Sequence, residues 1–163
     1  MSTSIHIKIP TITGQSEITG HEAQLEVLSF SHGASIPAMG HVSNKDRTAG
    51  HANFQDLAIT RYSDSATPQL MQALSGGTVL HGDTVLTIAR SDKDTSLPLF
   101  VITLTDVIVS SLSYGGSGGG DVPVETITLN YTKIKMEYSV QKSEGGKEGV
   151  TPFQFNLATN SAH

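Results

Sequence analysis

Apolar and polar residues alternate along most of this chain, and a period of two restricts it to a fold built mainly from β-strands. In residues 5–9 three isoleucines share one face, and His6 and Lys8 lie on the other. The same alternation predicts further strands at 51–60, 85–90, 99–105, 107–112, 122–140 and 153–157. The short connections favour antiparallel pairing in a single domain, 1–163, of roughly eight or nine strands.

The alternation changes phase at two places where no turn residue interrupts it. In residues 25–35 the apolar positions change face after Val27, which predicts a bulge or a bend. The apolar residues of 127–131 are also out of phase with those of 134–140, so we expect a bend near Thr132-Lys133. Strands that switch faces in this way curl a sheet toward a barrel.

One helix is predicted, at 64–74. Asp64, Ser65 or Thr67 can cap its first turn, and Pro68 suits that turn because proline has no N–H that would go unpaired there. Leu70 and Leu74 lie one turn apart and should face the core. Gly76-Gly77 supplies the left-handed residue that ends the helix.

Three polar or glycine-rich segments are predicted to be loops. Residues 36–50 have no period, and a loop of this length in a compact domain is usually functional. Residues 115–120, GGSGGG, should join two strands, and residues 142–149 should precede the last one.

Charge and composition exclude several classes of function. Charged residues make up 15% of the chain and the formal net charge is −5, which suits self-association better than binding to nucleic acid. There are no cysteines, so disulfides and cysteine-bound zinc are excluded. The first ten residues lack the basic and apolar regions of a signal peptide, and no apolar run is long enough to span a membrane.

No catalytic constellation is visible. The seven histidines form no His-x-His or His-x-x-x-His pair with a nearby carboxylate, and we interpret them as solvent-facing residues. Residues 113–118 resemble a nucleophile elbow only in composition, and the GGSGGG segment lacks the Lys-Ser or Lys-Thr of a phosphate-binding loop. Two alternatives to a self-assembling protein remain open. They are a metal-dependent enzyme that uses the histidines and a monomeric ligand-binding β-barrel.

Five segments, in order and with family-like spacing, resemble the haemolysin-coregulated protein (Hcp) family of type VI secretion. They are 25–33 (V-L-[SAG]-[FW]-S-x-G), 51–62 (A-N-x-Q-D-L-x-x-x-K-Y), 64–70 (D-x-[AS]-[ST]-P-x-L), 109–119 (V-S-S-x-x-x-G-G-S-G-G) and 125–134 (E-x-[IV]-x-L-[NS]-[FY]-x-[KQ]-[IV]). The resemblance spans nearly the whole chain.

The resemblance implies a β-barrel of two packed antiparallel sheets with one flanking α-helix. It also implies a structural protein, not an enzyme, without cofactor or metal. Its subunits form hexameric rings that stack into a tube, which a contractile sheath expels with a VgrG-type spike at its tip and effectors in its channel. The protein would be cytoplasmic before firing and secreted without a cleaved signal peptide. Since the chain ends shortly after Asn160, we expect no fused effector domain.

The resemblance also implies roles for individual residues. Ser31 is a candidate for the channel wall, and Asn53, Gln55 and Asp56 are candidates for the subunit interface, although they could instead satisfy the backbone at a strand start. The candidate ring-stacking loop comprises Ala38, Met39, Gly40, His41, Val42, Ser43, Asn44, Lys45, Asp46, Arg47, Thr48 and Ala49.

Overall fold

The computed structural model describes residues 2–39, 48–92, 95–141 and 147–162, and it confirms a mainly β fold with one helix. The first strands are β1 (Ser2–Lys8), β2 (Leu25–Glu26), β3 (Ser29–Ser31), β4 (Ala34–Ser35), β5 (Ala38–Met39), β6 (Thr48–Ala49), β7 (Asn53–Phe54) and β8 (Leu57–Tyr62). Then follow α1 (Ala66–Ser75), β9 (Leu80–Asp92), β10 (Thr95–Gly115), β11 (Val124–Asn130), β12 (Lys133–Gln141) and β13 (Lys147–Asn156).

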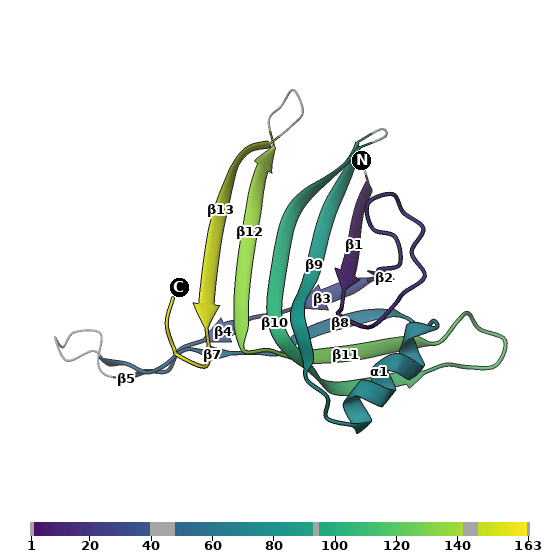
Figure 1. Ribbon diagram of the computed structural model, residues 1–163, viewed down its shortest axis with the longest axis horizontal. Coiled ribbons are helices and arrows are strands. Elements are labelled where there is room, and N and C mark those ends of the chain that lie inside the picture. The colour runs from purple at the N-terminus through teal and green to yellow at the C-terminus, as the bar shows by residue number, and fades with distance from the viewer. Residues whose placement is uncertain (1, 40–47, 93–94, 142–146, 163) are drawn as a thin grey trace.

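Two antiparallel sheets share the long strand β10 (Figure 1). The first half of β10 pairs with β9 and β12, which gives a first sheet in the order β2-β1-β9-β10-β12-β13. The second half pairs with β11, which gives a second sheet in the order β10-β11-β8-β3. The second sheet crosses behind the lower part of the first in Figure 1, and this arrangement agrees with the predicted barrel of two packed sheets.

The strand β10 replaces two predicted strands, 99–105 and 107–112. The expected break between them is a bulge, because the register with β9 shifts between Thr105 and Val107. Asp106 sits in the bulge with φ 50°, and its Oδ1 accepts a hydrogen bond from the Gly82 N–H at 3.2 Å. A bulge bends a strand without ending it, so β10 can serve both sheets.

Both predicted changes of phase lie where the chain leaves one sheet for the other. The Val27 N–H bonds to Ile5 of the first sheet, and the next N–H, that of Leu28, bonds to Thr60 of the second. The other crossing is at 131–132, between β11 and β12. A chain that changes sheets must also change which of its faces is buried, and this explains the change of phase.

The helix begins at Ala66, two residues later than predicted. Ser65 makes no side-chain capping bond. Asp64 caps the first turn instead, by accepting a hydrogen bond from the Ala66 N–H at 2.8 Å. The left-handed residue that ends the helix is Gly77, with φ 58°.

The core fills the space between the two sheets and the helix. It is one cluster of aliphatic side chains that includes Ile7, Leu57, Leu70, Leu104 and Leu129, all fully buried. Within the described part of the chain, no helix is long and apolar enough to cross a membrane.

Candidate functional site

An apolar face of the first sheet is left uncovered where β12 and β13 form its margin. We call it the apolar face, and its members are Phe100, Met136, Tyr138, Val140, Phe153 and Phe155. The register sets Phe100 beside Tyr138 and Met136 beside Phe153. The rings of Phe100 and Tyr138 lie 6.2 Å apart, and Tyr138 and Phe153 are 47% and 42% exposed.

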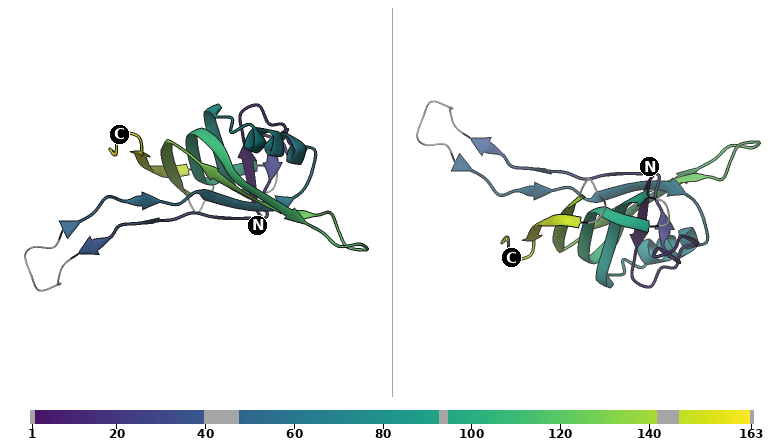
Figure 2. Two further views of the ribbon diagram at one scale, coloured as in Figure 1. Left: turned by 90° about the horizontal axis from the view of Figure 1, so that it is seen from below. Right: turned by 90° about the horizontal axis from the view of Figure 1, so that it is seen from above.

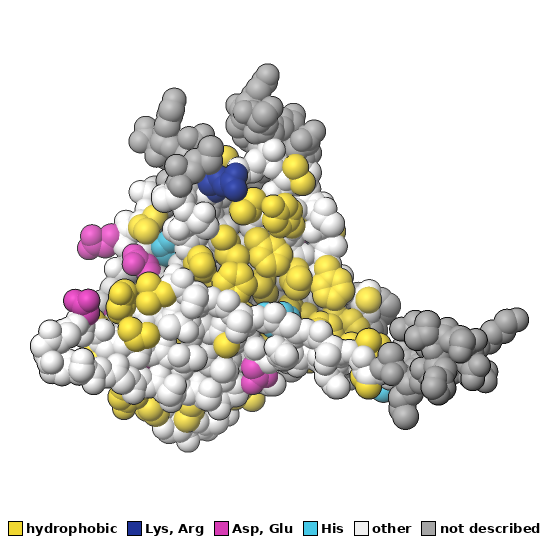
Figure 3. Space-filling model, turned by 180° about the vertical axis from the view of Figure 1, so that it is seen from behind, with side chains coloured by type: hydrophobic (Ala, Val, Ile, Leu, Met, Phe, Trp, Pro, Cys, Tyr) yellow, Lys and Arg dark blue, Asp and Glu magenta, His cyan; other side chains and the backbone are white. Residues whose placement is uncertain are grey.

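The apolar face continues the core beyond the edge of the second sheet. On β12 it has the same phase as Ile134, which is fully buried in the core cluster. In Figure 3 apolar side chains gather in one area at the centre and right of centre of the view. Contiguous apolar surface on a soluble protein marks a site of protein contact, because water is an unfavourable neighbour for it.

The margin beside the apolar face is a strand edge. Within the described residues β13 pairs only with β12, so its outer row of backbone N–H and C=O groups faces no strand of the same chain. Such edges are templates for pairing with another chain. The apolar face and the β13 edge together form a candidate self-association surface.

The outward face of the second sheet has a different character and is almost free of charge. Two rows of side chains cross it, and they define the hydroxyl face. The first row is Ser29, Thr60, Thr126 and Ser113, and the second is Ser31, Ala58, Thr128 and Ser111. Ser31, the predicted channel residue, is therefore exposed within a neutral hydroxyl surface. The lower part of Figure 3 shows mostly white side chains there.

The predicted loop at 36–50 is in part a two-stranded ribbon. β4 pairs with β7, and β5 pairs with β6, so the chain runs outward and returns alongside itself. Figure 2 shows this ribbon leaving the body at one end. Of the predicted stacking loop, Ala38, Met39, Thr48 and Ala49 lie in β5 and β6, and residues 40–47 lie outside the described residues.

The three candidate interface residues lie at the base of the ribbon. Asn53 is exposed on β7. The Gln55 N–H bonds to the Gly33 carbonyl at 2.9 Å. Both carboxylate oxygens of Asp56 are occupied within the chain, by the Ser110 hydroxyl at 2.7 Å and the Asn130 amide at 2.9 Å. Contact with a second subunit remains a prediction for all three residues.

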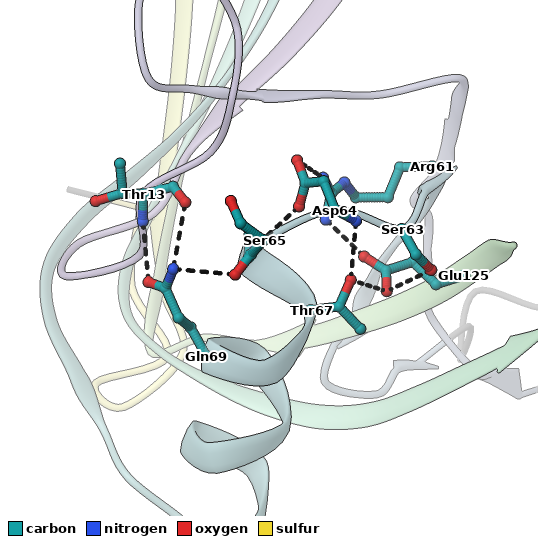
Figure 4. A network of polar contacts seen from close by, with 9 residues as sticks. Thr13, Arg61, Ser63, Asp64, Ser65, Thr67, Gln69 and Glu125 are labelled. Atoms are coloured by element: carbon teal, nitrogen blue, oxygen red, sulfur yellow. Dashed lines mark hydrogen bonds and ion pairs between the residues drawn. The ribbon is translucent and has the colours of Figure 1, made fainter. Parts of the chain in front are cut away.

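A buried ion pair between the neighbouring strands β8 and β11 of the second sheet was not predicted. Arg61 Nη1 bonds to Glu125 Oε1 at 2.6 Å, and both side chains are almost completely buried (Figure 4). Arg61 Nη2 also contacts Asp64 at 2.5 Å, and the hydroxyl of Thr67 donates to Glu125 Oε2 at 2.8 Å. The network joins β8, β11 and the start of α1. The phase of alternation contained the signal, because Arg61 follows Leu57 and Ile59 on the buried face of β8.

Among the described histidines, His6 is buried and His21 and His32 are half-buried, contrary to the solvent-facing interpretation. His6 is 1% exposed and stacks on His21 with ring centroids 4.6 Å apart. His32 is half-buried beside Tyr131. Tyr131 donates its proton to the Gln55 carbonyl at 3.0 Å, so His32 Nε2 must donate to the Tyr131 oxygen at 2.6 Å. Among the described residues no group of three His, Asp or Glu side chains could hold a metal ion.

These environments predict that stability falls in mild acid. Burial, with a smaller contribution from His21, lowers the pKa of His6, and burial lowers the pKa of His32; the usual value is 6.5. A lowered pKa in the fold gives stability that is present above pH 6.5 and is lost as the pH falls through the folded value. We expect the urea midpoint to drop by roughly a few tenths of a molar between pH 7.5 and pH 5. His32→Gln should make that drop smaller, and an unchanged drop in both His32→Gln and His6→Gln would contradict this assignment.

Comparison with known proteins finds a family model and a curated relative that agree with each other. Residues 6–138 match the family model described as "Type VI secretion system effector, Hcp". Protein hcp1 of Pseudomonas aeruginosa is 38% identical over 161 residues, which is 98% of each chain.

Solved structures agree with the fold. One described as the structure of a type six secretion system protein has a TM-score of 0.91 and 28% identity, and the match covers 99% of this chain and 100% of the other. The crystal structure of Hcp1 from Salmonella typhimurium has a TM-score of 0.78 and 24% identity over the whole of both chains, which supports the fold alone.

Proposed function

The chain belongs to the Hcp family of type VI secretion proteins, and from this premise we propose that it is a structural subunit of the secretion tube. Its copies form hexameric rings, and the rings stack into a tube. A contractile sheath expels the tube from the cytoplasm behind a VgrG-type spike, and effectors travel in its channel. The proposed function is structural, and none of its steps requires catalysis or a cofactor.

The observation that supports assembly is the uncovered apolar face beside the β13 edge. Tyr138 and Phe153 expose nearly half of their surface next to a well-packed core. A second copy seated there removes this surface from water, which contributes about 25 cal/mol for each Å² of apolar area. Each copy has one apolar face, and in the proposed ring a different part of the neighbouring copy's surface covers it. Such a contact is heterologous, and it closes into a ring when the rotation between neighbouring copies fits.

The hydroxyl face supports a channel wall. In a closed ring one face of each subunit must line the hole, and a wall without fixed charge neither repels nor traps a charged cargo. Ser31, Thr60 and Thr128 present hydroxyl groups that exchange hydrogen bonds easily with water or with a passing protein. We therefore assign the channel wall to the hydroxyl face.

The assembly is tested on the purified protein by light scattering after size-exclusion chromatography and by negative-stain electron microscopy. We expect the mass of six 17.2 kDa chains and ring-shaped particles with an open centre. A monomer at high concentration, with no rings, would favour the lone ligand-binding barrel. Stoichiometric zinc or iron in elemental analysis would favour the metal-dependent enzyme.

A charge in the channel wall should affect transport without affecting assembly. Thr60→Arg adds one cation to the hydroxyl face of every subunit, so a hexameric ring gains a belt of positive charge. We expect rings of normal mass, and export of a basic effector should fall by about tenfold or more, because like charges at close range cost over 1.4 kcal/mol. Export is measured in a secretion assay, with Thr60→Ser as the control. Normal export by the Thr60→Arg protein would exclude this face as the channel wall.

A further inference from the structure

Residues 13–24 fold back over the face of β1 that carries His6, and we call this segment the flap; it is the purple loop at the right of β1 in Figure 1. Its two ends are joined by backbone hydrogen bonds, from the Gly14 N–H to the Ala23 carbonyl and from the Ala23 N–H to the Ser16 carbonyl, both at 2.8 Å. Most side chains of the flap are exposed, and none of them is a buried hydrophobic residue. A segment with so few apolar contacts should open more easily than the strands beneath it.

The flap is attached to the body of the protein at two places. At its start the Thr13 N–H donates to the side-chain oxygen of Gln69 on α1 at 3.2 Å (Figure 4). Further along, the ring of His21 stacks on the ring of His6 with centroids 4.6 Å apart and planes 5° apart. His21 Nδ1 lies 3.1 Å from the Gln24 side-chain oxygen, which orients the ring. The histidine stack therefore joins the flap to β1.

The stack suits a neutral His6. The residue is 1% exposed, and within the described part of the chain its Nδ1 has no hydrogen-bond partner. A neutral ring can leave a lone pair at Nδ1, whereas a protonated ring carries an N–H there, and a buried donor without an acceptor is costly. If His21 were protonated as well, the two stacked rings would repel each other.

The charges around the stack decide how strongly it resists protonation. Glu26 of β2 lies opposite His6 in the register and favours the protonated ring, whereas the partner on β9, Thr87, is uncharged. Burial, followed by the effect of His21, outweighs Glu26 and lowers the pKa of His6 below 6.5. Further charged side chains on these elements are exposed to water, and they are Lys8 on β1 and Glu17 and Glu22 on the flap.

We propose that the stacked pair His6–His21 is an acid-sensitive latch, which holds the flap closed at neutral pH and releases it when His6 is protonated. His6 binds a proton more readily once the flap has opened and water reaches the ring. The stabilisation of the closed flap is therefore present above pH 6.5 and is lost as the pH falls through the lowered pKa of His6. The latch lies within one chain, so the inference does not depend on the proposed tube.

Hydrogen exchange of the intact protein, followed by mass spectrometry, tests the latch without any substitution. Exchange is measured at pH 7.5 and pH 5 and corrected for the intrinsic effect of pH on amide exchange. We expect the protection of the flap amides to fall by roughly fivefold at pH 5. Unchanged protection of residues 13–24 would overturn the latch.

A low concentration of urea separates local opening from unfolding of the whole chain. Opening of the flap exposes little surface, so its exchange at pH 5 should be nearly independent of urea below the unfolding transition. Exchange in β11, which lies in the second sheet, should instead rise with urea. If the flap amides follow urea as steeply as β11 does, acid loosens the entire fold and the latch is wrong.

Substitutions at His21 separate the charge of the ring from its stacking. His21→Phe keeps an aromatic ring whose face attracts a cation, so the flap should retain its protection at pH 5. His21→Ala removes the stack and should expose the flap amides already at pH 7.5. His81→Phe, at an exposed histidine near the start of β9, is the matched control and should lose protection at pH 5 as the original protein does. A loss in His21→Phe equal to that of the original protein would show that the histidine stack does not hold the flap.

Discussion

The double substitution Tyr138→Asp/Phe153→Asp is expected to convert the assembled protein into a folded monomer. Both side chains lie on the apolar face and are nearly half exposed, so the isolated chain tolerates a polar replacement. In the ring the same positions would bury two carboxylates without partners. Central interface aromatics cost about 2 kcal/mol or more each when lost, so the pair should weaken association about a thousandfold. Light scattering gives the mass, and circular dichroism checks the fold.

Val79→Asp is the matched control for this experiment. Val79 is also a partly exposed aliphatic residue, at 36%, but it follows α1 and lies outside the apolar face. We expect Val79→Asp to form rings as before. If Tyr138→Asp/Phe153→Asp still assembles with unchanged mass, the subunits meet through another surface and the assignment of the apolar face is wrong.

Breaking the buried ion pair should produce the largest loss of stability. Arg61→Met keeps the volume and removes the charge, which leaves Glu125 buried with the hydroxyl donors Ser63 and Thr67 as its remaining partners among the described side chains. Removing one partner of a buried pair costs about 3–5 kcal/mol, because the remaining charge has lost its compensation. Urea unfolding should show this change in the free energy of unfolding. The monomeric Tyr138→Asp/Phe153→Asp background keeps dissociation out of the measurement.

Two controls separate charge from packing. Arg61→Met/Glu125→Leu removes both charges of the pair, and it should lose clearly less stability than Arg61→Met alone, since the fully buried Glu125 carboxylate is no longer left without its cation. Lys8→Met removes an exposed cation and should change the free energy by no more than about 0.5 kcal/mol. An Arg61→Met protein as stable as the Lys8→Met protein would show that the pair does not hold β8 to β11.

The ion pair lies beside an open groove of about 620 Å³ that Arg61, Ser63 and Asp64 help to line. Arg61 contacts Asp64 at the start of α1, and Gln69 of the same helix bonds to the backbone of Thr13 (Figure 4). These contacts fix the β8–α1 connection, which forms one wall of the groove. Arg61→Met is therefore also expected to loosen this wall of the groove.

Strand positions could be predicted from the sequence because successive side chains of a strand point to opposite faces. A strand that is buried on one face therefore alternates apolar and polar residues. Ile127 and Leu129 are buried as their phase predicts, and the bend expected near Thr132-Lys133 separates β11 from β12. The same logic failed at His6, whose phase indicated solvent. The loop residue His21 stacks on His6 and covers that face. The alternation within a strand does not indicate whether a segment from elsewhere in the chain covers its polar face.

By itself the sequence determined the class of fold, the single helix, the bends between sheets and the resemblance to the Hcp family, because each depends on local periodicity or on the order of short segments. Tertiary structure decided which faces stay uncovered. Phe155 and Tyr138 belong to the same apolar surface, yet Phe155 stacks on Phe54 of β7 with ring centroids 4.9 Å apart, and Tyr138 stays 47% exposed. The ion pair of Arg61 with Glu125 arose in the same way, since residues 64 positions apart become neighbours only when β8 pairs with β11.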